Sequence, residues 1–159
     1  MKGRIFMLEN KENMCAFYAS DYHFEMMILP YLDKKIEENN NIVIFTENNL
    51  KDTINVLVSK TNLKEEKKEK ILNLDWKNND LKKFENLKEY EKSPKETCVF
   101  IKGTENYIKN VRNNINTNSK ENKLNIIDCY FVDDIDGNIN KVAKNYKNIL
   151  NTKGEAKIN

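Results

Sequence analysis

The sequence has little of what several common kinds of site depend on. Its 159 residues include four glycines, two prolines, one histidine and three cysteines. Neither glycine-rich phosphate-binding pattern, GxxxxGK[ST] or GxGxxG, occurs, and the GxSxG pattern of serine hydrolases is absent as well. These absences exclude the common nucleotide-binding loops and the nucleophile elbow. A nucleotide would have to bind through the free amides of a helix N-terminus.

The cysteines and the histidine give no support to a disulfide framework, a zinc site or a nucleophilic pair. Cys15, Cys98 and Cys129 are far apart, odd in number and without CxxC spacing. Each lies in an apolar run, where a free thiol behaves as a small hydrophobe. His23 lies across the first predicted turn from Cys15, so a Cys–His pair is conceivable. A capping or surface role is favoured for the histidine. This cysteine usage fits a reducing cytosol, so we expect a cytoplasmic protein.

The sequence also has no large excess of one sign of charge and no long apolar run. The 27 basic and 25 acidic residues leave a net charge of +2, and the two signs alternate in segments such as 64–70. A chain this balanced has no overall field that attracts nucleic acid or an anionic membrane. No segment approaches the roughly 20 apolar residues of a membrane span, and the N-terminal apolar stretch is too short for a signal peptide. We therefore expect neither nucleic acid nor a membrane as a partner.

The chain length predicts one domain. A chain of this size buries roughly two thirds of the surface that its unfolded form exposes, which is enough for an ordinary core. We expect a single α/β domain over residues 1–150. The tail 151–159 has no apolar pattern and is expected to be frayed.

Apolar runs alternate along the chain with segments of helical periodicity. Strands are predicted where the runs are continuous or β-branched, at 13–18, 42–46, 71–76, 97–102 and 124–132. Helices are predicted at 22–38, 49–60, 80–92 and 105–115, with a last one marked by Val142, Tyr146, Ile149 and Leu150. The polar segment 61–70 fits either a helix or a loop. The alternation predicts a three-layer α/β fold with an open, mostly parallel five-stranded sheet and helices on both faces.

In such sheets, ligands bind outside the carboxyl ends of the strands. Four carboxylates follow predicted strands: Asp21, Glu47, Asp133 and Asp134. Carboxylate oxygens suit Mg²⁺, so a Mg²⁺-dependent enzyme is one hypothesis. Helix capping and turn formation are favoured for these residues, because aspartate is common in both. The pattern of a receiver domain fails, because the last predicted strand ends in acids where a receiver has a lysine.

Several segments together resemble a known family. The strand NMCAFY at 13–18, the helical segment DYHFEMMILPYL at 21–32 and the strand IVIFTE at 42–47 resemble the opening of the MEDS family of sensory domains, first noted in methanogen and methylotroph regulators. The segment IDCYF at 127–131 is similar to that family's Cys-x-Tyr strand, and KGTENY at 102–107 to the segment before its penultimate helix.

Two positions depart from the family pattern. Asn13 stands where the family has a histidine, and Phe131 and Val132 separate the Cys-x-Tyr strand from Asp133. The resemblance implies a nucleoside-triphosphatase-like α/β core without a phosphate loop. It also implies that the domain senses a small compound or a partner, a role that family members often couple to a DNA-binding or kinase domain. No output domain is predicted within these residues, so the signal is expected to pass to another protein.

The leading hypothesis is a stand-alone sensory or regulatory domain without catalytic residues or a cofactor. Its pocket is expected between the ends of the first, second and last predicted strands. The residues predicted to line the pocket are Cys15, Tyr18, Glu47, Cys129 and Tyr130. Because strand side chains alternate between faces, only some of them can face the same helix layer.

Two further expectations concern interaction. The alternative to ligand sensing is a protein-interaction adaptor or inhibitor that binds no small ligand. A homodimer is also expected, because a regulator without an output domain shows its state on its own surface and two-fold dimers dominate soluble assemblies. The dimer interface is predicted on the first helix, which carries Tyr22, Met26 and Met27 and is expected to bend at Pro30.

Overall fold

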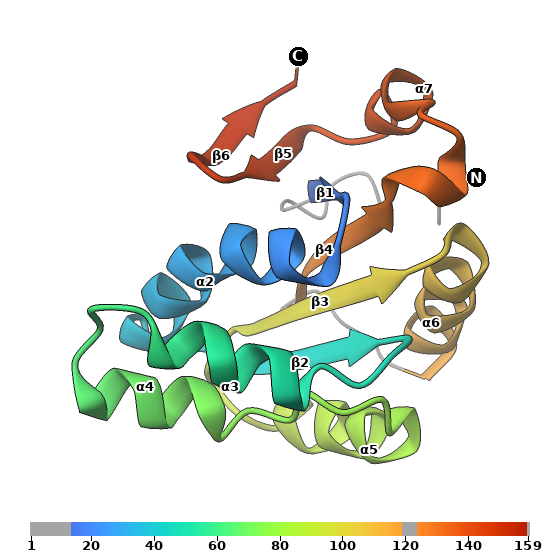
Figure 1. The fold of residues 1–159 in the computed structure, drawn as a ribbon. Helices are drawn as coiled ribbons and strands as arrows, with labels where there is room; N and C mark the ends of the chain where they lie inside the picture. Colours follow the sequence, from blue (N-terminus) through green and yellow to red (C-terminus); the bar gives the residue numbers. More distant parts are fainter. Residues whose placement is uncertain (1–13, 119–123, 159) are drawn as a thin grey trace.

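The computed structural model describes residues 14–118 and 124–158, which form one six-stranded sheet with helices packed against it (Figure 1). The sheet order is β2-β3-β4-β1-β5-β6. All neighbouring strands are parallel except β5 and β6. The strands are β1 (Met14–Tyr18), β2 (Asn41–Thr46), β3 (Thr97–Gly103), β4 (Leu124–Phe131), β5 (Asn148–Asn151) and β6 (Gly154–Lys157).

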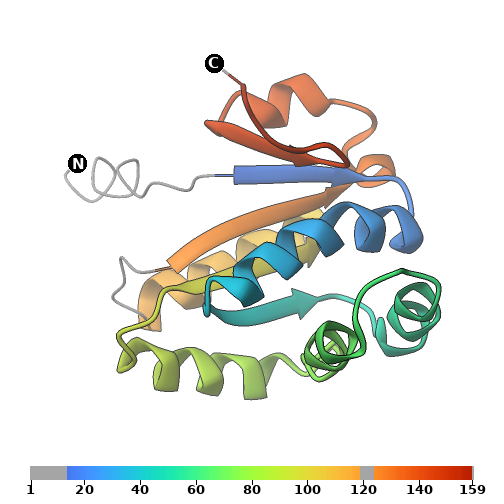
Figure 2. The ribbon, with the colours of Figure 1, turned by 90° about the vertical axis from the view of Figure 1, so that its left-hand side faces the viewer.

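Helices cover both faces of this sheet, and each face has its own apolar core. One core contains residues of α2 (Asp21–Glu37), α3 (Lys51–Ser59) and α4 (Glu65–Leu72). The other contains residues of α5 (Asp80–Glu91), α6 (Glu105–Asn118), the short 3₁₀ helix η1 (Val132–Ile135) and α7 (Ile139–Ala143). Figure 2 shows α2 crossing in front of the strands and α6 behind them. The expected three-layer, mostly parallel α/β class is confirmed, with six strands in place of five.

Strands that are covered on both faces explain the continuous apolar runs in the sequence. Every residue of β1 and of β3 is buried. The following helix α2 begins where the sequence predicts, because the Ser20 hydroxyl accepts a hydrogen bond from the His23 amide at 3.1 Å. Pro30 lies inside α2, which runs unbroken from Asp21 to Glu37.

The predicted strand at 71–76 is wrong. Ile71 and Leu72 are the last residues of helix α4. The polar segment before them is therefore helical from Glu65 onward. Ile71 is buried on the same face as α2, and the Trp76 indole N–H donates to its carbonyl oxygen at 2.8 Å. The apolar residues of this segment therefore face the core from a helix end and an anchored loop, and their alternation in the sequence imitates a strand.

The expected end of the chain is also corrected. The last helix, α7, ends at Ala143, and Ile149 and Leu150 lie in β5, which pairs with β1. The expected frayed tail contains β6, which pairs with β5 in an antiparallel hairpin. Three of the four β6 residues are exposed, so the strand has no apolar pattern that a sequence would show. Asn13 and the rest of segment 1–13 lie outside the described residues.

Candidate functional site

A buried lysine joins the carboxyl ends of three strands. Lys102, near the end of β3, is only 2% exposed. Its Nζ lies 2.9 Å from Asp21 Oδ1, beyond β1, and 2.8 Å from Asn48 Oδ1, beyond β2. Asn48 Nδ2 donates to the other Asp21 oxygen at 2.8 Å, and the Tyr18 ring centroid lies 4.7 Å from the ammonium. The ammonium is thus paired, hydrogen-bonded and held against an aromatic face.

A buried acid lies beside this lysine. Glu25 on α2 is fully buried, and its Oε2 accepts a hydrogen bond from the Thr53 hydroxyl. Its Oε1 has no partner among the residues described. Burial raises the pKa of this carboxyl, and the Thr53 hydrogen bond and the charge of Lys102 act against that rise. The sequence places Lys102 at the strand edge but gives no sign of Glu25, which occupies an ordinary helical position.

Three of the four strand-end carboxylates of the Mg²⁺ hypothesis, Asp21, Glu47 and Asp134, have separate partners. Asp21 pairs with Lys102. Glu47 Oε1 accepts the Thr104 amide at 2.8 Å, and Asp134 Oδ2 accepts the Glu105 amide at 2.9 Å. Carboxylates from the ends of β2 and β4 therefore cap the first turn of α6, where the helix dipole favours negative charge. Within ranges 14–118 and 124–158, no three acidic, cysteine or histidine side chains gather closely enough to hold a metal ion.

The five residues predicted to line a pocket lie in three places. Cys15 and Tyr130 belong to the core under α6, and Tyr18 and Cys129 to the core under α2. The sheet separates these two pairs, as the alternation of strand side chains requires. Glu47 is exposed at the sheet edge, where it caps α6. Burial, helped by the charge of Asp128, raises the pKa of the Cys15 thiol to about 12.

One of these residues, Tyr130, lines a hollow of about 290 Å³ beside α6. The hollow contains a charged network built on Asp128, a β4 residue only 2% exposed. The Arg112 guanidinium on α6 donates to Asp128 through Nε at 3.1 Å and Nη2 at 3.0 Å. Tyr146 donates to the same carboxylate at 2.7 Å, and the Tyr130 and Tyr146 hydroxyl oxygens are 2.6 Å apart. The charge pair raises the pKa of Arg112 against the effect of burial.

One feature of the sequence does indicate this network. Asp128 interrupts the otherwise apolar second half of the run 124–132. A carboxylate in a strand buried on both faces needs a cation and hydrogen-bond donors. An arginine guanidinium can donate two parallel hydrogen bonds to one carboxylate, and Arg112 does so to Asp128. Only the packing of α6 on β4 shows that Arg112 is the partner of Asp128.

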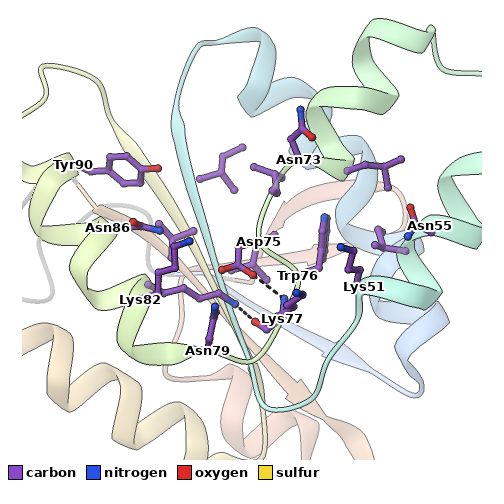
Figure 3. A pocket seen from close by; sticks show the side chains of 17 residues that line it. Lys51, Asn55, Asn73, Asp75, Trp76, Lys77, Asn79, Lys82, Asn86 and Tyr90 are labelled. Carbon is purple, nitrogen blue, oxygen red and sulfur yellow. Dashed lines mark hydrogen bonds between the residues drawn. The ribbon is translucent and has the colours of Figure 1, made fainter.

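A second, larger groove lies at the outer edge of β2 (Figure 3). It has a volume of about 540 Å³ and is bounded by α3, the segment 73–79 and α5. Four lysines line it: Lys51, Lys77, Lys82 and Lys83. The Lys83 amino group donates to the Lys77 carbonyl oxygen, and its burial lowers its pKa to about 8. The sequence does not predict this groove, because the alternating apolar residues of 71–76 imitate a strand of the sheet.

Comparison with family models, with curated proteins and with solved structures finds no match to this chain. The sheet order and the helices on both faces define it as a three-layer α/β domain with a mostly parallel sheet. The resemblance to the MEDS family stays a prediction. In the part of the chain that the structure describes, no helix has the length and apolar character needed to cross a membrane.

Proposed function

We propose that this chain is a non-catalytic sensory or regulatory domain of the cytoplasm that binds a small ligand in the hollow beside α6. The observation that supports it is the buried Asp128 held by Arg112 and Tyr146. A buried ion pair stabilises a fold less than apolar residues of similar volume commonly do. Departures of this kind from core patterning are expected at functional sites. The three free cysteines fit a reducing compartment.

Two cationic side chains of the hollow, Arg112 and Lys109, would pair with an anionic group of a ligand, although the exposed Glu105 also lines the hollow. Arg112 uses Nε and Nη2 for Asp128, and its Nη1 forms no hydrogen bond with any residue in the described ranges. Lys109 lies one helical turn earlier on α6, is exposed and lines the same hollow. Ile108 and the Tyr146 ring supply apolar surface. The volume of about 290 Å³ lies just below the range of roughly 300–1,000 Å³ for ligand pockets and suits a small molecule.

Thermal unfolding in the presence of small carboxylates, phosphates and nucleotides tests this proposal. A ligand that binds only the native state adds about 2.7 kcal/mol of stability at one hundred times its dissociation constant. We expect Lys109→Met to abolish most of the shift. Lys141→Met, an exposed lysine on α7 outside the hollow, is the matched control and keeps the shift. A broad screen in which no compound raises the unfolding temperature contradicts the proposal.

A second candidate function, an adaptor or inhibitor that binds a partner protein, is favoured by the groove beside β2. That groove lies at a sheet edge, the place where extended segments of other proteins are commonly bound. The two functions are compatible, because the groove and the hollow share no lining residue. A Mg²⁺-dependent enzyme gains no support from the separate partners of Asp21, Glu47 and Asp134.

A further inference from the structure

We propose that the groove beside β2 binds an extended acidic segment of a partner protein, which adds to the sheet as a further strand. β2 is the outermost strand on its side of the sheet. An edge strand presents a row of unpaired backbone groups, and pairing with another chain is the chemistry open to them. The proposal is independent of the small ligand and would supply the route by which a regulatory domain reaches its target.

The register of β2 shows which backbone groups point outward. The Asn41 amide donates to the Glu96 carbonyl oxygen at 2.9 Å, and the Glu47 amide donates to Lys102 O at 3.0 Å. In a parallel ladder, alternate residues bond to the same neighbour, so the intervening residues direct their N–H and C=O groups to the open side. Ile42 and Ile44 are such residues. None of the residues described forms a hydrogen bond with their outward groups.

The groove lies along this open edge. Three consecutive residues of β2 line it: Ile42, Val43 and Ile44. The side chain of Val43 belongs to the core under α6, and that of Ile44 to the core under α2. Residues with side chains on opposite faces can line one groove when the edge of the strand forms its floor. In Figure 3, Asn86 and Tyr90 lie on one side of the groove and Asn73 and Asn55 on the other, with Asp75 and Trp76 between them.

The charge of the groove identifies the partner as acidic. Lys51, Lys77 and Lys82 are exposed at its rim and Lys83 is buried in its wall. Among the described residues, Asp75 is the one acidic residue that lines the groove. The whole chain is balanced, with a net charge of +2, so this excess of lysine is local. Amide side chains of Asn55, Asn73, Asn79 and Asn86 add donors and acceptors around the floor. Charge complementarity of this kind sets specificity and speeds association.

The proposal is tested with the full chain and a fluorescent eight-residue peptide of alternating valine and glutamate. The control peptide carries lysine in place of each glutamate. We expect the glutamate peptide to bind at least tenfold more tightly than the lysine peptide, with an affinity that falls as salt is raised. Amide hydrogen exchange gives the second readout. The Ile42 and Ile44 amides should exchange at least tenfold more slowly in the complex, because the peptide takes up their outward N–H groups.

Charge reversal at the rim separates the groove from general attraction. Lys82→Glu is expected to weaken binding of the glutamate peptide at least tenfold. Lys88→Glu reverses an exposed charge on the same helix outside the groove and should change binding less than twofold. The proposal is overturned if the glutamate peptide fails to bind at millimolar concentration, if both peptides bind equally, or if Ile42 and Ile44 stay unprotected in the complex. Self-association of the chain that protects these two amides without peptide would instead identify a second copy as the occupant.

Discussion

Lys83 is a lysine whose amino group lies within the fold. It occupies the inner side of α5, is 1% exposed and donates to the Lys77 carbonyl oxygen. Burial is the main cause that lowers its pKa to about 8, and the nearby Asp75 and Asp80 carboxylates oppose this effect. The amino group therefore holds the segment around Lys77 against α5. Burial disfavours the charged form of this amino group.

This amine makes stability depend on alkaline pH in a direction that can be checked. The pKa of Lys83 falls from 10.5 to about 8 on folding. Between these values the unfolded chain holds a proton that the folded chain has released, so the contribution of Lys83 to stability rises with pH. We expect the free energy of unfolding of the wild type, minus that of Lys83→Met, to rise by up to about 1.4 kcal/mol per pH unit.

Urea unfolding of both proteins between pH 7 and pH 10 measures this difference. Subtraction removes the contributions of other groups, such as the Cys15 thiol, whose raised pKa acts in the opposite direction. Lys82→Met, which replaces an exposed lysine next to Lys83, is the matched control. Wild-type and Lys83→Met curves that run parallel over this range would show that the amine keeps its ordinary pKa.

At the scale of elements, side chains from the end of β2 and from α6 pack closely against one glycine at the end of β3, and α5 anchors one of them. Gly103 ends β3, and a β-carbon at this position would lie 2.6 Å from Glu47 Oε1 and 2.7 Å from Tyr107 Cδ2. Glu47 is held there because it caps α6, and the Tyr107 hydroxyl donates to Asp80 at 2.9 Å. The close approach of the two side chains to the strand leaves room for hydrogen alone.

We expect Gly103→Ala to lower the free energy of unfolding by about 1–3 kcal/mol, the usual cost of forcing extra volume into a packed site. Chemical denaturation measures the change. In a Glu47→Ala background the same substitution should cost less, because one of the two clashing side chains is gone. An unchanged midpoint for Gly103→Ala in the wild-type background would mean that Glu47 and Tyr107 move aside freely.

The elements differ in how far the sequence predicts them. The strands β1 to β4 are predicted because burial on both faces leaves continuous apolar runs. β5 has four residues and follows a short helix, so its apolar pair Ile149 and Leu150 extends a helical pattern equally well. β6 is stabilised by pairing with β5 and has no apolar face to reveal it.

The candidate site is less predictable than the fold, since its parts meet only through packing. The sequence places Lys102, Asp21 and Asn48 near the carboxyl edge, and the structure joins them. It gives no indication that Arg112 on α6 faces Asp128, because the register of a helix on a sheet depends on the whole core. The groove beside β2 depends on which strand is outermost, a property of strand order that local patterns do not contain.

At the scale of the whole molecule, α2 presents two large apolar side chains to its surroundings. Tyr22 is 56% and Met26 44% exposed, one turn apart on the helix. Met27, the third residue predicted to form an interface, is buried in the core and is unavailable to a partner. A small exposed apolar pair on a long helix is the surface on which the expected homodimer would form.

We therefore expect the protein to dimerise at high concentration and Met26→Glu to dissociate the dimer, because a charge at an apolar seam is left without a partner. Sedimentation equilibrium over a range of concentrations measures the association. Leu81→Glu is the control, since Leu81 on α5 is 82% exposed and lies on the other face of the sheet. A wild type that stays monomeric at every concentration contradicts the dimer.

The strand order has a consequence for the time course of folding. Among the described residues, β1 is the first strand in the chain, but it lies between β4 and β5, the last two strands of the parallel part of the sheet. Its residue Met14 pairs with Ile127 on one side and with Asn148 on the other. Contacts that span most of a chain slow folding, because a long loop must close before they form. During translation β1 lacks both of its neighbours until β4 and β5 have been synthesised, so its apolar side chains stay open to chaperones until then.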